Sequence, residues 1–350
     1  MPSLAIIGTT SWGIALGVIL ARKETKVRLW ARTEAEAIEL TRSGPAPDLL
    51  PAIKFPTNLS ITSSLGEALS GVDAVLLVVP SQTMRQNIRL VAKHLTARML
   101  IVSAAKGLEI GTGKRMSQVI SDEIEPRFRP NICVLSGPNL SPEILADLPA
   151  ATVVAATDET LARKAQKLLN TPHLCIYTNT DVVGVELGGA LKNIIALGAG
   201  IVDGLNYGDN AKATFITRGL TEMTALGVAL GANPLTFSGL AGLGDLIATC
   251  ASPLSRNHYV GVELAKGHSL KEITGSMNSV AEGVSTTLVV WNLTRKMELA
   301  MPITETLYRV LYESADIQRE VVKLMAATAT NELAGRKWRL FSALRRGRNP

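Results

Sequence analysis

Aromatic residues are scarce in this chain of 350 residues, of which they make up only 4%. So few rings provide little surface on which nucleic-acid bases could stack, and the composition therefore argues against a nucleic-acid partner. The hydrophobic residues, at 47%, are mainly aliphatic. A chain of this length and composition most naturally forms a globular protein with two buried cores, one in each of two domains.

Cysteine and histidine are scarce as well. Cys133, Cys175 and Cys250 are far apart and form no C-x-x-C pair, which fits a reducing compartment and indicates neither a disulfide framework nor a zinc site. The four histidines, at positions 94, 173, 258 and 268, show no metal-ligand spacing, so we expect no bound metal.

Signals for export or membrane insertion are weak. The first residues lack the basic segment and following apolar segment of a signal peptide, so we expect a cytoplasmic protein. Residues 185–205 are apolar enough to suggest a membrane span, but Glu186, Lys192 and Asp203 interrupt them. This pattern favours a buried helix in a soluble protein with no integral membrane segment.

The net charge of +6 is concentrated near one end of the sequence. Residues 336–348 contain six Lys or Arg and no acidic residue, which equals the whole surplus. We interpret this segment as part of a basic tail in the form of a solvated, frayed helix. Contact with an anionic membrane or a partner protein is the alternative.

Apolar, β-branched segments alternate with helical segments through the first half of the chain. They lie at 4–8, 26–31, 73–79, 99–105, 131–137 and 151–157. Continuous apolar strands separated by helices are typical of a parallel sheet that is covered on both faces. We therefore predict an α/β, Rossmann-type, doubly wound N-terminal domain.

Strand-like segments disappear from about residue 180 onward. Segments rich in helix formers follow at 183–203, 210–231, 257–267, 280–298 and 302–326. The predicted organisation is a dinucleotide-binding domain over 1–180, an all-α substrate domain over 181–335 and the basic tail over 336–350. We expect the site between the helical domain and the carboxyl edge of the sheet.

The sequence GTTSWG, residues 8–13, follows the first apolar segment directly. This is the position of the G-x-G-x-x-G turn in dinucleotide-binding domains. Gly8 allows the tight turn and Gly13 allows close helix–sheet packing, but Thr10 replaces the central glycine. A slightly shifted loop could accept Thr10 and use its hydroxyl as a phosphate donor. The alternative is a strand–helix turn without a ligand.

The residue after the second apolar segment bears on the choice of cofactor. An acidic residue there binds the ribose 2′-hydroxyl of NAD, but this chain has Arg32, a cation suited to the 2′-phosphate of NADP. We favour NADPH, with NADH as an alternative or second cofactor. A solvated surface arginine is the competing interpretation, since Glu34 and Glu36 are close by.

Lys192 is the most informative candidate for catalysis. Its neighbours one helical turn away are Gly188, Gly189, Ile195 and Ala196, all of them small or apolar. Burial among such residues lowers the pKa of a lysine toward a value useful for proton transfer. Lys192 is therefore a candidate acid/base, and a structural lysine whose ammonium group reaches solvent is the alternative.

A second polar group lies further along the chain. Ser255, Arg256 and Asn257 offer a hydroxyl, a fork of N–H donors and an amide, which together suit a phosphate. The ordinary start of a helix is the alternative interpretation.

Several longer blocks carry a resemblance to a known family. They are SAAKGLE (103–109), LSGPNLSPEI (135–144), GVELGGALKNIIALGAGIVDGLNYGDN (184–210), SGLAGLGDLIATCASPLSRN (238–257) and VAEGVST (280–286). With these blocks in order, residues 4 to about 330 closely resemble the bacterial-type NAD(P)-dependent glycerol-3-phosphate dehydrogenases. The resemblance implies reversible reduction of dihydroxyacetone phosphate to sn-glycerol 3-phosphate, which would supply glycerophospholipid synthesis.

The resemblance also implies a role for individual residues. Lys192 would be the catalytic acid/base and would also contact the substrate. The other substrate-binding residues would be Lys106, Gly137, Asn139, Asp245, Ser255, Arg256 and Asn257. The cofactor-binding residues would be Gly8, Thr10, Ser11, Trp12, Gly13, Arg32, Lys106, Ser141, Arg256, Val280 and Glu282.

This chain departs from the family pattern at three positions. Thr10 replaces a glycine, Asn139 stands where serine or threonine is frequent, and Ser141 stands where alanine is frequent. Asn139 can still donate a hydrogen bond to the substrate, whereas Thr10 bears on cofactor affinity.

Two other functions remain open from the sequence. One is a two-domain dehydrogenase of similar layout that acts on a different hydroxy acid or sugar. The other is a non-catalytic protein that senses a dinucleotide. A homodimer is also possible, because the helical domain is more apolar than a single domain requires.

Overall fold

The computed structural model describes residues 1–46, 50, 53–277 and 280–326. Its first half is one eight-stranded sheet with the strand order β3-β2-β1-β4-β5-β6-β7-β8. The strands are β1 (Ser3–Ile7), β2 (Lys26–Trp30), β3 (Leu59–Thr62), β4 (Ala74–Leu77), β5 (Leu100–Ser103), β6 (Ile132–Ser136), β7 (Ala150–Ala155) and β8 (Leu174–Asn179). All neighbouring pairs are parallel except β6 and β7.

Helices cover this sheet and complete what we call the sheet half. They are α1 (Ser11–Arg22), α2 (Glu34–Ser43), α3 (Leu65–Leu69), α4 (Met84–Ala92), α5 (Met116–Glu123), α6 (Ser141–Leu145) and α7 (Glu159–Leu169), with short helices η1 (Ser81–Thr83) and η2 (Pro126–Asn131). The strand order reverses between β1 and β4, which is where doubly wound sheets bind their ligands. The predicted Rossmann-type fold is confirmed.

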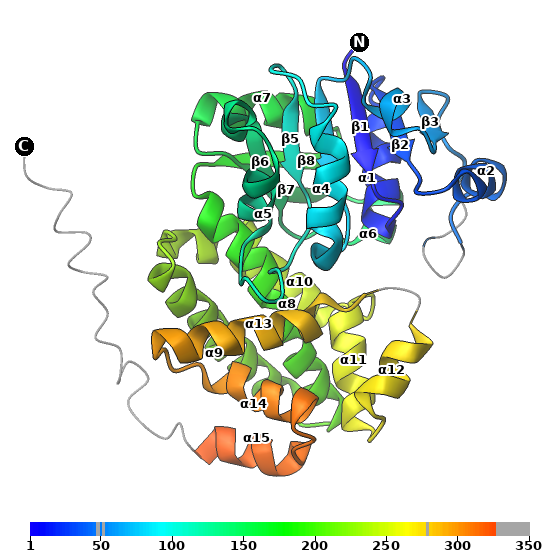
Figure 1. Cartoon of the computed structure of the whole chain (residues 1–350). Helices are drawn as coiled ribbons and strands as arrows, with labels where there is room; N and C mark the ends of the chain where they lie inside the picture. The colour runs from blue at the N-terminus through cyan, green and yellow to red at the C-terminus, as the bar shows by residue number, and fades with distance from the viewer. Residues whose placement is uncertain (47–49, 51–52, 278–279, 327–350) are drawn as a thin grey trace, which may run out of the picture.

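The second half is helical and lies below the carboxyl ends of strands β1 to β6 in Figure 1. It consists of α8 (Val182–Gly204), α9 (Gly208–Ala229), η3 (Pro234–Ser238), η4 (Leu240–Gly244), α10 (Asp245–Ala251), α11 (Arg256–Ala265), α12 (Leu270–Ser276), α13 (Glu282–Met297), α14 (Pro302–Tyr312) and α15 (Ile317–Ala326). We call this the helical half. The predicted basic tail lies outside the described residues.

Helix α8 is the centre of the helical half. It is long and apolar enough to cross a membrane, yet its apolar window is wholly buried within the protein. The other helices and the sheet, chiefly β6, supply this burial, so the expectation of a buried helix over this segment is confirmed. Glu186 near its start accepts hydrogen bonds from the Ser117 backbone N–H at 2.7 Å and hydroxyl at 2.5 Å, and from Arg115. These bonds join α8 to α5 of the sheet half.

The sequence missed some elements. Strands β3 and β8 were not predicted, because each mixes apolar and polar residues instead of forming a continuous apolar run. The helix predicted over 302–326 is two helices. Ser314 between them has a left-handed backbone with φ of 54°, and Asp316 accepts from the Arg319 N–H at 2.8 Å at the start of the second helix.

Glycines allow α8 and α11 to touch through their backbones. A Cβ on Gly261 of α11 would lie 1.9 Å from the Leu197 carbonyl oxygen of α8, and one on Gly200 would lie 2.0 Å from the His258 carbonyl oxygen. Real Cβ atoms do not come so close, so any larger residue pushes the helices apart. This contact fixes where α11 begins, and with it the position of Arg256.

We predict that Gly261→Ala lowers the free energy of unfolding by about 1–3 kcal/mol, the usual cost of overpacking. Gly275→Ala is the matched control, because a Cβ at this exposed helical position meets no heavy atom within 4 Å. Alanine is the better helix former, so the control should gain up to about 1 kcal/mol. Urea unfolding of the two variants measures both effects. Equal stabilities would contradict the close approach of the two helices.

Candidate active site

The GTTSWG turn joins β1 to α1 and needs its two outer glycines. Gly8 has φ of +116°, and a Cβ there would lie 2.5 Å from the Val78 carbonyl oxygen. A Cβ on Gly13 would lie 2.2 Å from the Gly8 carbonyl oxygen. Neither position tolerates a side chain, so the turn keeps the backbone geometry that brings free N–H groups of a helix start toward an anion.

Thr10 has a structural role in this turn. It is the N-cap of α1, where its hydroxyl oxygen accepts from the Gly13 N–H at 3.1 Å and donates to the Val78 carbonyl at 3.0 Å. The hydroxyl is therefore engaged by the protein and not directed at a phosphate. Its replacement of glycine adds a helix cap and a bond to the end of β4, which rigidifies the turn.

The turn opens into a cavity of about 410 Å³ between the two halves. Twelve of the predicted site residues line it: Thr10, Ser11, Trp12, Lys106, Asn139, Ser141, Lys192, Ser255, Arg256, Asn257, Val280 and Glu282. A larger cavity of about 650 Å³ lies among α8, α9, α14 and α15. Its lining is mainly apolar and includes none of the predicted residues, so we assign the site to the smaller one.

Two lysines on the floor of this cavity share one aspartate that lies beneath them. Asp245, whose side chain is 1% exposed, accepts from Lys106 Nζ at 2.7 Å through Oδ2 and from Lys192 Nζ through Oδ1. Lys106 also donates to the Gly137 carbonyl at 2.7 Å, and Lys192 donates to the Thr249 hydroxyl at 2.6 Å. Two ammonium groups and one carboxylate leave one positive charge in excess.

The environment of Lys106 perturbs its ionisation. Burial lowers the pKa of Lys106 to about 8, and the nearby Lys192 charge acts in the same direction. The Asp245 carboxylate opposes both by raising this pKa. A lysine that titrates near neutral pH can exchange protons during a reaction, which an ordinary surface lysine cannot do efficiently.

Unpaired polar groups face the same cavity. Both side-chain polar atoms of Asn139 and the indole nitrogen of Trp12 are buried without a hydrogen-bond partner among the described residues. Arg256, an exposed residue that lines the cavity, makes no hydrogen bond or ion pair in the part of the chain that the structure describes. Buried polar groups such as those of Asn139 and Trp12 rarely stay unpaired, so these two side chains, together with the free Arg256 guanidinium, are suited to bind a ligand.

Other predicted residues already have partners within the protein. Ser255 is the N-cap of α11 and accepts from the His258 N–H at 3.2 Å. Asn257 donates to Asn193 at 2.9 Å and accepts from the Gly283 N–H at 2.8 Å. Their hydrogen bonds place Arg256 and the start of α13 beside the cavity.

Five predicted residues lie outside the cavity lining. Gly8 and Gly13 shape the turn, Asp245 lies beneath the two lysines, and Gly137 contributes its carbonyl to Lys106. Arg32 is exposed beyond β2. At that corner the Glu36 carboxylate accepts from the Thr9 hydroxyl at 2.5 Å and the Arg32 N–H at 2.9 Å.

The polar residues that line the cavity but were not predicted from the sequence are Thr9, Asn193 and Thr249. Thr249 follows Asp245 by four residues on α10, and its hydroxyl donates to the Asp245 carbonyl at 2.6 Å. The four-residue spacing, one helical turn from a candidate acid, was a signal that could have found it.

Comparison with known proteins assigns the family. A model of the NAD-dependent glycerol-3-phosphate dehydrogenase N-terminus matches residues 3–162, and a model of the C-terminus of the same enzyme matches residues 181–322. The chain belongs to the NAD-dependent glycerol-3-phosphate dehydrogenase family. The resemblance inferred from the sequence blocks is thereby confirmed.

Individual relatives agree with the family assignment. Glycerol-3-phosphate dehydrogenase [NAD(P)+] of Dehalococcoides mccartyi is 64% identical over 99% of this chain and 97% of the relative. The enzyme of that name from Streptomyces coelicolor is 48% identical over 94% of this chain and 97% of its own. The crystal structure of glycerol-3-phosphate dehydrogenase from Coxiella burnetii superposes with a TM-score of 0.87, at 37% identity over 93% of this chain and 98% of that one.

Proposed function

We propose that this protein uses NADPH or NADH to reduce dihydroxyacetone phosphate to sn-glycerol 3-phosphate, reversibly. Family membership supports the reaction. The observation that carries it is the Lys106–Asp245–Lys192 cluster on the floor of the cavity, with the unpaired Arg256 guanidinium beside it. This arrangement suits a small anionic ketone.

The residues around the turn fit a dinucleotide. Gly8 and Gly13 leave no room for side chains, and Trp12 presents an unpaired buried nitrogen. The proposed cofactor contacts from the turn are Gly8, Thr10, Ser11, Trp12 and Gly13. The proposed contacts from elsewhere in the chain are Arg32, Lys106, Ser141, Arg256, Val280 and Glu282. The reduced cofactor, when bound, supplies the hydride that a ketone requires.

Lys192 is the proposed proton donor. Negative charge develops on the carbonyl oxygen as a ketone is reduced, and the Lys192 ammonium group stabilises this charge and transfers its proton. General acid catalysis of this kind contributes roughly 100- to 10,000-fold. Asp245 and Thr249 fix the Lys192 ammonium by hydrogen bonds. Lys106, Arg256 and the Asn139 amide bind the rest of the substrate.

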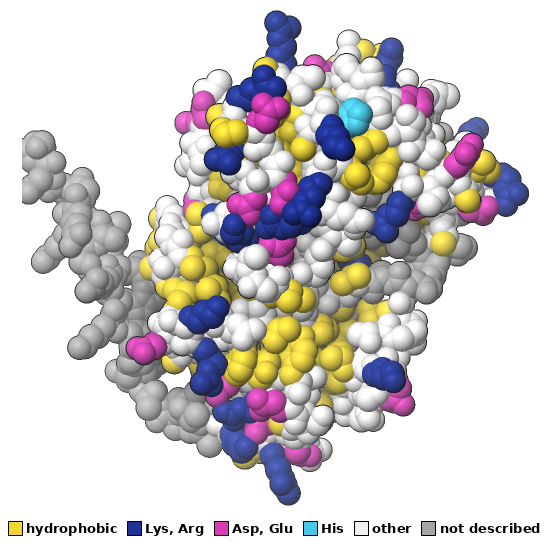
Figure 2. Space-filling view, in the orientation of Figure 1, with side chains coloured by type: hydrophobic (Ala, Val, Ile, Leu, Met, Phe, Trp, Pro, Cys, Tyr) yellow, Lys and Arg dark blue, Asp and Glu magenta, His cyan; other side chains and the backbone are white. Residues whose placement is uncertain are grey.

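Several finer features belong to the same proposal. The protein acts in the cytoplasm and provides glycerol phosphate for membrane lipids. Its dinucleotide-binding domain comprises residues 1–180, and its substrate domain comprises 181–335. A homodimer formed through the helical half is consistent with the hydrophobic side chains that gather around α13 and α14 in Figure 2.

We predict that Lys192→Ala lowers kcat for dihydroxyacetone phosphate reduction at least about 100-fold, since it removes the general acid. Lys212→Ala is the matched control, because Lys212 also pairs with an aspartate, Asp203, at 2.5 Å but does not line the cavity. Circular dichroism verifies that both variants are folded. Near-normal turnover by Lys192→Ala would exclude the assigned role. If the wild type oxidises another hydroxy acid or sugar faster, the protein is a dehydrogenase for that substrate. If it binds the dinucleotide without any turnover, it is a dinucleotide sensor.

We predict that Arg32→Ala raises the KM for NADPH about tenfold, the usual effect of losing one charge-assisted hydrogen bond, and leaves the KM for NADH nearly unchanged. Arg42→Ala is the control, because Arg42 is exposed on the neighbouring α2 and pairs with Glu39 at 2.8 Å. Initial rates with each cofactor measure the effect. Equal changes in the KM for both cofactors would show that Arg32 does not recognise the 2′-phosphate. Glu36 would then be the charged residue that determines cofactor choice at the end of β2.

A further inference from the structure

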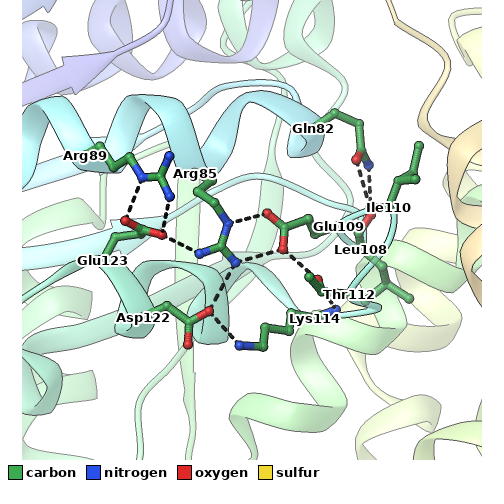
Figure 3. A network of polar contacts seen from close by, with 10 residues as sticks. All are labelled: Gln82, Arg85, Arg89, Leu108, Glu109, Ile110, Thr112, Lys114, Asp122 and Glu123. Carbon is green, nitrogen blue, oxygen red and sulfur yellow. Dashed lines mark hydrogen bonds and ion pairs between the residues drawn. The ribbon is translucent and has the colours of Figure 1, made fainter.

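The loop after β5 carries Lys106 into the cavity, and a single side chain from another element holds its backbone. Gln82 in η1 donates from Nε2 to the Leu108 carbonyl at 2.8 Å and accepts at Oε1 from the Ile110 N–H at 2.9 Å. Figure 3 shows this amide lying against the loop. A side-chain amide offers a donor and an acceptor side by side, so Gln82 fixes two backbone groups within four residues of Lys106.

The same amide is connected to the helical half. Its Nε2 also donates to the Ser81 hydroxyl at 3.0 Å. Ser81 in turn donates its backbone N–H to Glu282 at 2.8 Å and its hydroxyl to Glu282 at 2.5 Å. A Cβ on Gly107 would lie 2.5 Å from the Ser81 Oγ and 3.0 Å from Glu282 Oε2. The loop is therefore packed directly on this cross-domain contact.

An ion-pair network holds the loop from its other side. Arg85 of α4 binds the Glu109 carboxylate through Nε at 2.7 Å and Nη2 at 2.8 Å. It also binds Asp122 and Glu123 of α5 (Figure 3). These bonds lower the pKa of the Glu109 carboxyl. Gln82 of η1 thus binds the backbone of Leu108 and Ile110, and Arg85 of α4 binds the side chain of Glu109 between them.

We infer that Gln82 is a positioning residue, which holds the loop so that Lys106 reaches both Asp245 and the Gly137 carbonyl. Both Lys106 contacts are 2.7 Å long, so a shift of about 1 Å breaks them, and a displacement of that size can cost roughly 100-fold in rate. Through Ser81 and Glu282, the position of Lys106 depends on the fit between the two halves of the protein. The expected loss of rate rests on the proposed function, the reduction of dihydroxyacetone phosphate.

The first test compares Gln82→Met with Gln166→Met. Methionine has a similar length and removes every hydrogen bond of the amide. Gln166 is the matched control, because its Nε2 donates to the Ile176 carbonyl at 2.6 Å and it does not line the cavity. Gln82→Met should lower kcat for dihydroxyacetone phosphate reduction about 10- to 100-fold and raise the KM for this substrate, because Lys106 also binds it. Gln166→Met should leave both values unchanged.

The second test needs no substrate. Acylation of Lys106, followed against pH by peptide mass spectrometry, reports its pKa in the folded protein. Burial lowers this pKa and the Asp245 carboxylate raises it, so a loop displacement that changes both surroundings should move the midpoint of Gln82→Met away from that of the wild type. A Gln82→Met midpoint equal to that of the wild type overturns the inference whatever the rate. If the wild type does not reduce dihydroxyacetone phosphate, the proposed function fails and the acylation result still decides the role of Gln82.

A second variant covers the case in which Gln82→Met does not fold. Gln82→Asn keeps the amide but is one methylene shorter, so it cannot reach Leu108 and Ile110 together. Like Gln82→Met, it should lower kcat and move the Lys106 midpoint away from the wild-type value. A folded Gln82→Asn with unchanged kcat and an unchanged midpoint overturns the inference.

Discussion

The carboxylate of Asp245, buried between the ammonium groups of Lys106 and Lys192, is the interaction on which the site depends. A buried charge is costly unless it is paired, and here the Lys106 charge is paired with Asp245 only when the two halves of the chain are together. Lys106 comes from the loop after β5, whereas Lys192 and Asp245 come from α8 and α10. The excess positive charge that remains faces the cavity, where it can attract an anionic substrate.

The rest of the fold brings these three side chains to one place. The reversal of strand order between β1 and β4 leaves a crevice at the carboxyl edge of the sheet. Glu186 joins α8 to α5, and the bond between Ser81 and Glu282 joins η1 to α13. Glycine contacts between α8 and α11 then set the distance of Arg256 from the cluster. Packing far from the cavity thereby determines the geometry inside it.

The sequence predicted the parts of this architecture that depend on strong local patterns. Continuous apolar strands indicated the parallel sheet, and a lysine among glycines indicated a buried ammonium group at Lys192. The partnership between Lys106, Lys192 and Asp245 could not be predicted from local pattern, because it joins residues that are 139 and 53 positions apart. Thr10 shows the same limit. Its hydroxyl caps α1 and bonds to Val78, a residue 68 positions away, so its place in the motif gave no indication of this role.

The most direct test of the central interaction is the titration of Lys106 in Asp245→Asn. Asp245 raises the Lys106 pKa against the effect of burial, so removal of its charge should lower the pKa further. The midpoint of Lys106 acylation should then fall below that of the wild type, so the protonated fraction at neutral pH should decrease. A folded variant with an unchanged or higher midpoint would show that Asp245 does not stabilise the ammonium group, and would contradict this account.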